Sequence, residues 1–434
     1  MKMKNKISVR HWLTFIIAGL VGQLAWAIEN NYLNTYVYDV THAYSFIPIM
    51  TAASAAAATI TTLFMGALSD RLGKRKAFIS FGYILWGISI ILFAFLDPSS
   101  TVSFVNGNVM LAGSMIVVMD CVMTFFGSTA NDASFNAYVT DNTDTSNRGK
   151  VESFLSVLPL VSLIAIVVIG GMLVDDKTNT HWDIFFYLFG GITLVAGVVL
   201  LFIIPKENLE ARKDTNYFKE LIYGFRPSVI KKNKLLYITL LAFMAFNIAI
   251  QVYMPYFMVY IQRVLLIQGG EFTVTLGLVL VIACILTVVI GLFMDKIGKN
   301  KIIIPALITC ILGGVLMTFA KSVPAVIPSG IILISGYLVG TAVLGAKIRD
   351  YTPKEETGLF QGVRMIFAVL IPMVTGPYIG QAVSSISGLT YVNDFGQTDI
   401  QPSGFVFFGA AVVFLIAIIP VLILLKKEKE NDKK

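Results

Sequence analysis

The sequence predicts an all-α membrane protein in which twelve transmembrane helices form two pseudo-symmetric six-helix bundles around a central cavity. Three observations support this fold class. Of the 434 residues, 56% are hydrophobic and only 14% are charged, whereas globular domains carry about 25% charged residues. The apolar residues form long stretches, and one short motif occurs twice, half a chain length apart. Most of the chain must therefore face lipid or other helices rather than water.

Twelve apolar stretches have the length of about 20 residues that a membrane-spanning helix requires. In chain order they are 11–33, 43–68, 77–96, 106–130, 150–174, 183–204, 235–261, 271–294, 301–320, 324–346, 357–384 and 403–425. Transmembrane β-strands are shorter, at about 10 residues, and alternate in polarity. The first stretch follows the basic segment "MKMKNKISVR", but no small-residue cleavage site ends it. We therefore interpret it as an uncleaved first span of a multi-pass protein.

The basic residues predict the orientation in the membrane. With a cytoplasmic N-terminus, 29 of the 33 Lys and Arg residues fall in the segments 1–10, 69–76, 142–150, 205–234, 295–301, 347–356 and 426–434. The positive-inside rule then places both termini in the cytoplasm. The short loops that carry these charges form no single basic stripe, which argues against nucleic-acid binding. We expect a prokaryotic inner or cytoplasmic membrane and a functional monomer.

The longest polar stretch divides the chain into two halves. Residues 1–204 are predicted to form the N-terminal six-helix bundle and residues 235–425 the C-terminal one. Residues 205–234 between them mix lysines with aromatic and aliphatic residues, which indicates a cytoplasmic linker with an interfacial helix. Residues 426–434 are predicted to be a charged cytoplasmic tail.

A repeated motif follows the second span of each half. Residues 66–76 read "GALSDRLGKRK" and residues 291–301 read "GLFMDKIGKNK", so both fit G-x-x-x-D-[RK]-x-G-K-x-K. The first glycine allows close helix packing, and the second, Gly73 or Gly298, allows a tight turn. The aspartate, Asp70 or Asp295, lies at the helix end within reach of a basic partner.

With this motif the whole chain resembles the major facilitator superfamily, whose loop motif is G-x-L-x-D-R-x-G-R-[KR]. Lys74 stands where that motif usually has Arg. The resemblance implies alternating access, with the first, fourth, seventh and tenth helices lining the cavity. It also implies that the motif stabilises one face of the transport cycle.

Charged residues near the motif are candidates for a conformational gate. Arg364 lies about two turns into the eleventh span, where a buried guanidinium needs an anion. We expect Asp70 to pair with Arg364 or the nearby helix end, and Asp295 to pair with Arg148. The alternative is that Arg364 only extends to the membrane surface. The gate residues are Asp70, Arg71, Gly73, Asp141, Arg148, Asp295, Lys296, Gly298 and Arg364.

Polar stripes on three spans predict the substrate site. Residues three or four apart share a helix face, and such stripes occur on the first, fourth and seventh spans. The candidate substrate-binding residues are Gln23, Trp26, Asn30, Thr124, Asn131, Asn247, Gln251 and Tyr256. Pro255 is expected to break or bend the seventh span and free backbone groups near a cavity.

Two carboxylates inside spans are candidates for ion coupling. Asp120 lies near mid-depth of the fourth span and Glu29 lies farther out in the first. Burial disfavours the charged form of a carboxyl group, so either could carry a proton, or its oxygens could help hold Na⁺. The alternative is that each tunes the polarity of a vestibule or bonds a neighbouring helix. Apart from this coupling cation we expect no cofactor and no metal site, and the three cysteines suggest no disulfide.

A narrower resemblance covers residues 131–153, "NDASFNAYVTDNTDTSNRGKVES". This stretch resembles the end of the fourth helix in sucrose/proton cotransporters and in glycoside–pentoside–hexuronide:cation symporters. The matching residues are Asn131, Ala137, Asp141, Arg148 and Ser153, whereas Asn136 departs from an expected Arg.

The sequence thus predicts a secondary active transporter for a small polar solute, a sugar or glycoside, coupled to H⁺ or Na⁺. Alternatives are a proton-driven exporter of multiple drugs or other amphipathic compounds, a lipid carrier, and a membrane sensor that binds a solute without moving it. The sequence contains no Walker loop that would point to transport driven by ATP. It also contains no nucleophile–base pair or metal-ligand cluster that would point to an enzyme.

Overall fold

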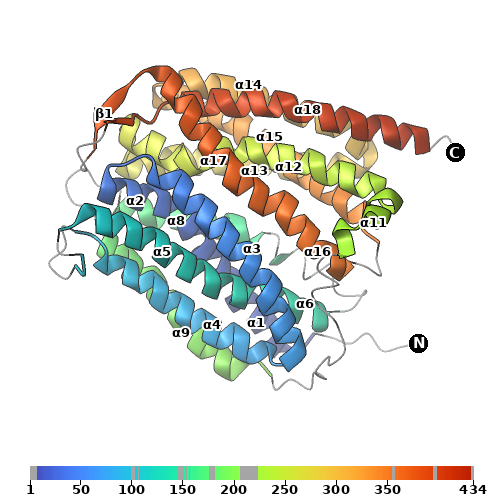
Figure 1. Cartoon of the computed structure of the whole chain (residues 1–434), viewed down its shortest axis with the longest axis horizontal. Coiled ribbons are helices and arrows are strands. Elements are labelled where there is room, and N and C mark those ends of the chain that lie inside the picture. The colour runs from blue at the N-terminus through green and yellow to red at the C-terminus, as the bar shows by residue number, and fades with distance from the viewer. Residues whose placement is uncertain are drawn as a thin grey trace. The chain divides into compact units, whose positions relative to one another are not determined.

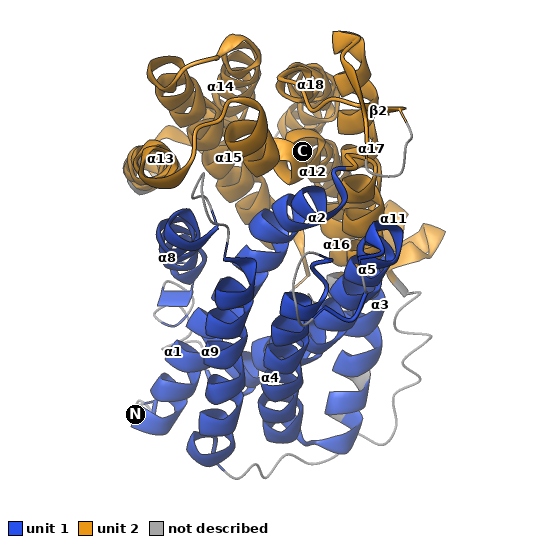
Figure 2. Cartoon of the chain, turned by 90° about the vertical axis from the view of Figure 1, so that its left-hand side faces the viewer, with its two compact units in different colours: residues 1–42, 56–215 blue, residues 43–55, 216–434 orange. Residues whose placement is uncertain are grey.

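The computed structural model describes residues 7–98, 103–105, 107–143, 151, 154–155, 157–174, 181–205, 223–353, 357–393 and 398–431. Within these ranges the side chains at positions 67, 70, 223, 292, 295, 357–359, 361 and 431 fall outside the description. The described chain is helical apart from one short hairpin (Figure 1). It separates into two compact units, unit 1 with residues 1–42 and 56–215 and unit 2 with residues 43–55 and 216–434 (Figure 2).

Unit 1 contains the helices of the first half of the chain, except that residues 46–55 of α3 belong to unit 2. In order they are α1 (Val9–Ala27), η1 (Ile28–Tyr32), α2 (Leu33–Thr41), α3 (Phe46–Leu72), α4 (Arg75–Leu92), η2 (Phe93–Phe95), α5 (Val109–Gly127), η3 (Ser128–Phe135), α6 (Asn136–Asp141), α8 (Leu158–Leu173) and α9 (Trp182–Ile203). Helices α4 and α9 pack side by side, as do α1 and α8. Large aromatic side chains of α4, such as Trp86 and Tyr83, are buried within this unit.

Unit 2 contains η4 (Tyr223–Phe225), α11 (Pro227–Lys232), α12 (Lys234–Val259), η5 (Tyr260–Val264), α13 (Gly269–Ile297), α14 (Lys299–Phe319), α15 (Val323–Tyr351), α16 (Thr357–Met365), η7 (Ile366–Leu370), α17 (Ile371–Ser384), η8 (Ser385–Ser387) and α18 (Phe405–Asn431). Helix α12 packs against α17 and α18, and α15 packs against α13 and α14. The strands β1 (Thr390–Val392) and β2 (Thr398–Ile400) form an antiparallel hairpin that the sequence did not predict, with Tyr391 opposite Asp399.

The predicted spans agree with the helices. Eleven helical segments in the described residues are long and apolar enough to cross a membrane, and α8 lies within the remaining predicted stretch at 150–174. The all-α membrane class and the twelve-helix architecture are therefore confirmed. Of the predicted linker, residues 206–222 lie outside the described part, and η4 and α11 form its end.

The first span is longer than predicted and ends at Thr41 rather than at residue 33. Its polar segment stays helical because η1 is a π-helical turn whose side chains satisfy nearby carbonyls. Asn30 Nδ2 donates to Trp26 O (2.8 Å), and Asn31 Nδ2 donates to Ala27 O (2.9 Å). The fourth and seventh spans also contain π-helical turns, η3 and η5, and extend to Asp141 and Val264.

Pro255 does not break the seventh span. It is buried inside α12, which continues to Val259 and passes directly into η5. Neighbouring helices shield the backbone groups that a proline frees, so a helix can pass through it.

Residues 43–55 belong to unit 2, although the sequence places them in the N-terminal bundle. Tyr44 explains this assignment: its ring lies 4.6 Å from that of Tyr256, and its hydroxyl lies 3.1 Å from Ser384 Oγ. The Tyr44 amide N–H donates to the Tyr391 hydroxyl (3.2 Å). The chain therefore passes from unit 1 to unit 2 after His42 and returns within α3.

Candidate functional site

A carboxylate and a hydroxyl meet in the interior of unit 1. The Thr124 hydroxyl on α5 donates to Glu29 Oε1 on η1 at 2.9 Å. Glu29 is 8% exposed and Thr124 is fully buried. Burying a carboxylate costs free energy unless the group is neutral or hydrogen-bonded, and the Thr124 hydroxyl lowers this cost for Glu29.

Asp120 lies in the same region. It is 1% exposed and precedes Thr124 by one helical turn on α5. Residues four apart on a helix are neighbours, and Thr124 in turn contacts Glu29. The structure therefore brings together the two carboxylates that the sequence singled out for ion coupling.

Sequence reasoning missed a third carboxylate, Asp132, in η3. Its Oδ2 accepts a hydrogen bond from Ser128 Oγ at 3.1 Å. The candidates from this span were Thr124 and Asn131, and Asp132 was left aside although it follows Thr124 and Ser128 at steps of four residues. The four-residue separation of Ser128 and Asp132 was the available signal.

An aromatic and amide cluster lies beside η3. Trp26 Nε1 donates to Asn131 Oδ1 (3.4 Å), and Asn131 Nδ2 donates to the Tyr83 hydroxyl (2.7 Å). The Trp26 and Trp86 rings are 5.0 Å apart. The sequence of the third span shows no polar stripe, so the candidate residues did not include Tyr83 and Trp86 of α4.

The remaining candidate residues differ in accessibility. Gln23 and Trp26 are half-buried and Asn30 is exposed. In unit 2, Asn247 and Gln251 are half-buried on α12.

Tyr256, also on α12, is fully buried. Its hydroxyl donates to Pro377 O at 2.5 Å, and its ring packs on Tyr44. Tyr256 is therefore enclosed by other side chains, whereas Asn247 and Gln251 are partly exposed.

The predicted gate pairs lie partly outside the described residues. The side chains of Asp70 and Asp295 and the whole of Arg148 fall there, so neither proposed pair is described. Arg71, Lys296 and Arg364 are exposed in the structure. The turn glycines behave as expected, with φ of 60° at Gly73 and 91° at Gly298.

Asp141 binds a residue of the first motif that the sequence analysis did not select. Arg75 Nε lies 3.2 Å from Asp141 Oδ2, and Arg75 Nη1 donates to Ser69 Oγ at 2.6 Å. The Arg75 side chain is 9% exposed. This ion pair joins the motif to the end of the fourth span, and the place of Arg75 in the motif was the available signal.

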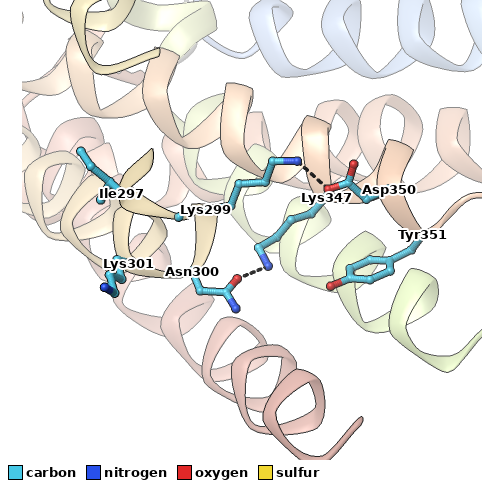
Figure 3. A pocket seen from close by; sticks show the side chains of 8 residues that line it. Ile297, Lys299, Asn300, Lys301, Lys347, Asp350 and Tyr351 are labelled. Atoms are coloured by element: carbon cyan, nitrogen blue, oxygen red, sulfur yellow. Dashed lines mark hydrogen bonds and ion pairs between the residues drawn. The ribbon is translucent and has the colours of Figure 1, made fainter. Parts of the chain in front are cut away.

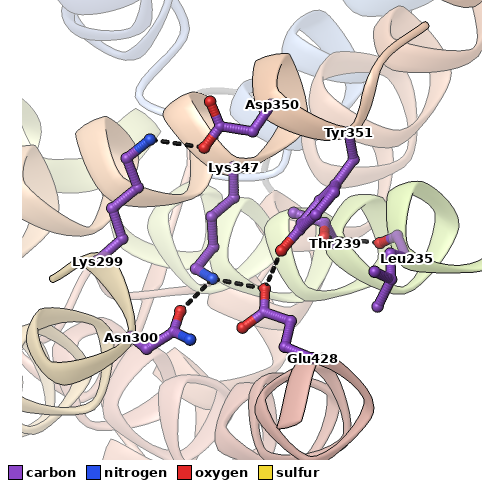
Figure 4. A network of polar contacts seen from close by, with 8 residues as sticks. All are labelled: Leu235, Thr239, Lys299, Asn300, Lys347, Asp350, Tyr351 and Glu428. Carbon is purple, nitrogen blue, oxygen red and sulfur yellow. Dashed lines mark hydrogen bonds and ion pairs between the residues drawn. The ribbon is translucent and has the colours of Figure 1, made fainter. Parts of the chain in front are cut away.

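The second motif makes different contacts at the equivalent place. Asn300 occupies the motif position of Arg75, and its Oδ1 accepts from Lys347 of α15 (Figure 3). Lys347 also forms an ion pair with Glu428 of α18 at 2.6 Å, and the Tyr351 hydroxyl donates to the same carboxylate (Figure 4). Both charged side chains of this pair are buried.

This network replaces the arginine of the first motif with a lysine and a carboxylate from two other helices. Glu428 belongs to the predicted charged tail, yet α18 carries it into the interior of unit 2. A neighbouring pocket of about 400 Å³ is lined by Gly298, Lys299, Lys301 and Asp350 among others, and Lys299 pairs with Asp350 at 2.6 Å.

Comparisons with known proteins agree with this architecture. The profile of the Major Facilitator Superfamily matches residues 12–344 and 260–434. No curated protein matches the chain.

Several solved structures share the fold. A D-xylose–proton symporter superposes with a TM-score of 0.72 at 16% identity, covering 96% of this chain and 97% of that one. The xylose transporter XylE from E. coli, in a partially occluded inward-open conformation, gives 0.69 at 13% identity, with 95% and 97% covered. The nucleoside transporter NupG gives 0.68 at 11% identity, with 95% and 99% covered. With its family profile matched over nearly its whole length, the chain belongs to the Major Facilitator Superfamily and is a multi-pass membrane transporter rather than an enzyme.

Proposed function

We propose that this transporter moves a small polar solute, a sugar or glycoside, by alternating access coupled to H⁺ or Na⁺. The observation that carries the proposal is the polar site buried in unit 1. There Glu29 accepts from Thr124, Asp120 lies one turn away, and the half-buried Trp26 lies three residues before Glu29. An acidic group in such a place binds a proton or a cation at lower cost than it carries a bare charge.

Asp120 and Glu29 are the proposed coupling residues. Both are almost fully buried, and the Thr124 hydroxyl supplies a hydrogen bond to one of them. A carboxylate that loses its charge when it takes up H⁺, or whose charge Na⁺ neutralises, fits the interior better in the loaded state. Loading would then favour the conformational change that turns the binding site from one side of the membrane to the other, which is the thermodynamic basis of symport.

The proposed substrate class is supported by side chains of each unit taken by itself. In unit 1, Trp26 offers an aromatic face and Gln23 and Asn30 offer amide donors and acceptors, and in unit 2 the half-buried Asn247 and Gln251 offer further amides. Side chains of these kinds suit a ring with several hydroxyl groups. Two of the similar structures are named for xylose and one for nucleosides, which are compounds of this kind. The resemblance of residues 131–153 to glycoside–pentoside–hexuronide:cation symporters supports the same class.

The orientation and the gate are part of the proposal. The bias of Lys and Arg supports cytoplasmic termini. The motif loops would then lie on the cytoplasmic side, where the Arg75–Asp141 pair and the Lys347–Glu428 pair each brace one unit.

Transport by purified protein in liposomes tests the proposal. Sugars, glycosides and nucleosides are screened with separate H⁺ and Na⁺ gradients, together with Asp120→Asn and Glu29→Gln. We expect each variant to lose accumulation against a gradient while it retains exchange of solute at equal concentrations. Asp183→Asn and Glu271→Gln are matched controls because these carboxylates are exposed in the first turns of α9 and α13. Gradient-driven uptake by both site variants at the wild-type level would contradict the coupling assignment, and dye export without sugar uptake would favour an exporter.

A further inference from the structure

Three hydrogen bonds in unit 1 form a chain that runs in one direction. Trp26 Nε1 donates to Asn131 Oδ1, Asn131 Nδ2 donates to the Tyr83 hydroxyl, and the Tyr83 hydroxyl donates to the Ala18 carbonyl at 2.5 Å. The chain starts and ends on α1, on residues about 12 Å apart along the helix axis. It passes through η3 and α4, so it ties the first, fourth and third spans together.

The direction of this chain determines how the Asn131 amide is oriented. The Tyr83 hydroxyl donates its only hydrogen to Ala18 O, so it can only accept a hydrogen bond from Asn131. The Trp26 indole nitrogen can only donate. A flipped amide would place two acceptors together at Tyr83 and two donors together at Trp26. The Asn131 amide is therefore held in one orientation, because Trp26 can act only as a donor toward it and Tyr83 only as an acceptor.

Asn131 has little surface left for a solute. It is 4% exposed, and Gly22 of α1 lies directly against its amide. A Cβ on Gly22 would lie 2.2 Å from Asn131 Nδ2 and 2.5 Å from the Tyr83 hydroxyl. The amide thus reaches the backbone of α1 only because residue 22 has no side chain, and it is enclosed there.

Trp26 is held on its other side as well. Its ring lies 5.0 Å from that of Trp86 at an angle of 57°, and Trp86 also contacts Tyr83. Gly127 leaves room for both indoles, because a Cβ there would lie 3.0 Å or less from each. Despite these contacts Trp26 is only half-buried. One part of a fixed aromatic ring therefore stays accessible.

We propose that Asn131 is a positioning residue: it holds the Trp26 indole in place as a stacking surface for the hydroxylated ring of the transported solute. This inference rests on the proposed function and refines it, since Asn131 acts through Trp26 rather than by touching the solute. A side chain fixed before binding loses little conformational freedom when the solute arrives. The Tyr83 hydroxyl is part of the same device, because it orients the amide that orients the indole.

Two variants separate this role from direct binding of the solute by Asn131. Asn131→Leu removes the amide, whereas Tyr83→Phe removes one oxygen and leaves the amide in place. Asn131→Leu removes the acceptor of the indole, and Tyr83→Phe removes the group that orients this acceptor, so both variants loosen the indole and each should raise the KM of the transported solute by about 3- to 10-fold with kcat largely retained. Tyr253→Phe is the matched control, because the described residues offer the buried Tyr253 hydroxyl no hydrogen-bond partner.

A measurement without solute tests the geometry alone. Near-ultraviolet circular dichroism reports the fixed, closely spaced indoles, and Trp26→Phe defines the spectrum that lacks this one. We expect Asn131→Leu and Tyr83→Phe to shift the spectrum toward that of Trp26→Phe and to increase quenching of tryptophan fluorescence by acrylamide. Tyr253→Phe should leave the tryptophan bands of the spectrum and the quenching unchanged, because it removes a tyrosine signal but no contact of Trp26.

Three results would overturn the inference. One is an unchanged spectrum in Tyr83→Phe, which decides the matter even if Asn131→Leu does not fold. The second is loss of solute binding in Asn131→Leu with wild-type KM in Tyr83→Phe, which would make Asn131 a ligand. The third is a changed spectrum with unchanged KM in both variants. Failure of the proposed function is a different result, because the wild-type protein would then transport none of the screened ring compounds. That result would also exclude the stacking role of Trp26. The spectra would still report whether Asn131 and Tyr83 hold the indole in place.

Discussion

The Thr124 hydroxyl donates a hydrogen bond to Glu29 Oε1 at 2.9 Å, and neither side chain is more than 8% exposed. This bond joins the first span to the fourth at the level of the π-helical turn η1. It gives the buried carboxylate a hydrogen-bond donor that does not itself titrate, so this bond remains possible whether Glu29 is charged or protonated.

The first prediction concerns this bond. Thr124→Val keeps the shape of the side chain but removes the donor, and an unsatisfied buried acceptor costs about 1–3 kcal/mol. We expect lower thermal stability in detergent and reduced gradient-driven uptake, whereas Thr124→Ser, which keeps the hydroxyl, stays near wild type. Equal behaviour of the valine and serine variants would show that the hydroxyl has no role.

The second prediction concerns the Arg75–Asp141 pair. A hydrogen bond to a charged group contributes about 1.5–3 kcal/mol, and Arg75 is the more buried partner. We expect Arg75→Met and Asp141→Asn each to lower stability, and the double variant to lose clearly less than the sum of the two. Unfolding of the three variants forms a double-mutant cycle. Additive losses would mean that the two side chains do not interact.

The third prediction concerns the Lys347–Glu428 pair. Removing one member of a buried pair leaves an uncompensated charge, at a cost of about 3–5 kcal/mol. We expect Glu428→Ala and Lys347→Met to be strongly destabilising, and removal of the chain after Leu425 to have the effect of Glu428→Ala. Lys427→Gln is the control, because Lys427 is 51% exposed and pairs with Glu430 at the surface, where a pair contributes about 0–1 kcal/mol.

The third prediction also separates a structural tail from a solvated one. If truncation after Leu425 left the melting temperature of the protein unchanged, residues 426–434 would be dispensable for unit 2, contrary to the contacts of Glu428.

The fourth prediction concerns Tyr44, which ties residues 43–55 to unit 2. Its ring is fully buried against Tyr256, and its hydroxyl bonds Ser384. We expect Tyr44→Ala to speed amide hydrogen exchange in the first turns of α3 and in strand β1, whose Tyr391 hydroxyl the Tyr44 amide contacts. Tyr44→Phe loses only one hydrogen bond, about 1 kcal/mol, and should change exchange far less. The same exchange rate in both variants would show that the ring does not hold the segment.

Composition and the length of the apolar stretches were sufficient for the helical class and for the approximate position of the spans that the structure describes. A window of about 20 apolar residues has few other solutions in a bilayer, because backbone groups must be satisfied within the segment. The ends of the spans were less predictable. The first helix runs on to Thr41 through residues 29–34, which are mostly polar; the amides of Asn30 and Asn31 in this segment donate to the carbonyls of Trp26 and Ala27 in the preceding turn.

Local spacing located Glu29, Asp120, Thr124 and Asn131, but it could not reveal their partners. Asp132 was missed although it continues the four-residue spacing of Asp120, Thr124 and Ser128, because the neighbouring Asn131 was selected instead. Tyr83 and Trp86 were missed because they look like ordinary core residues until the fold brings α4 against η3. Arg75 looked like one more loop cation until Asp141, 66 positions away, proved to be its neighbour.

The sequence by itself determined that the chain crosses the membrane repeatedly, that its halves share a motif, and that a few ionisable groups lie among the apolar residues. These features depend on residue type and local period, which the chain carries everywhere along its length. Only the tertiary structure decided that Thr124 bonds Glu29, that Asn131 joins Trp26 to Tyr83, and that Glu428 leaves the tail for a buried pair with Lys347. Such contacts join residues far apart in the chain, and they arise because buried polar groups must find partners wherever helix packing brings them.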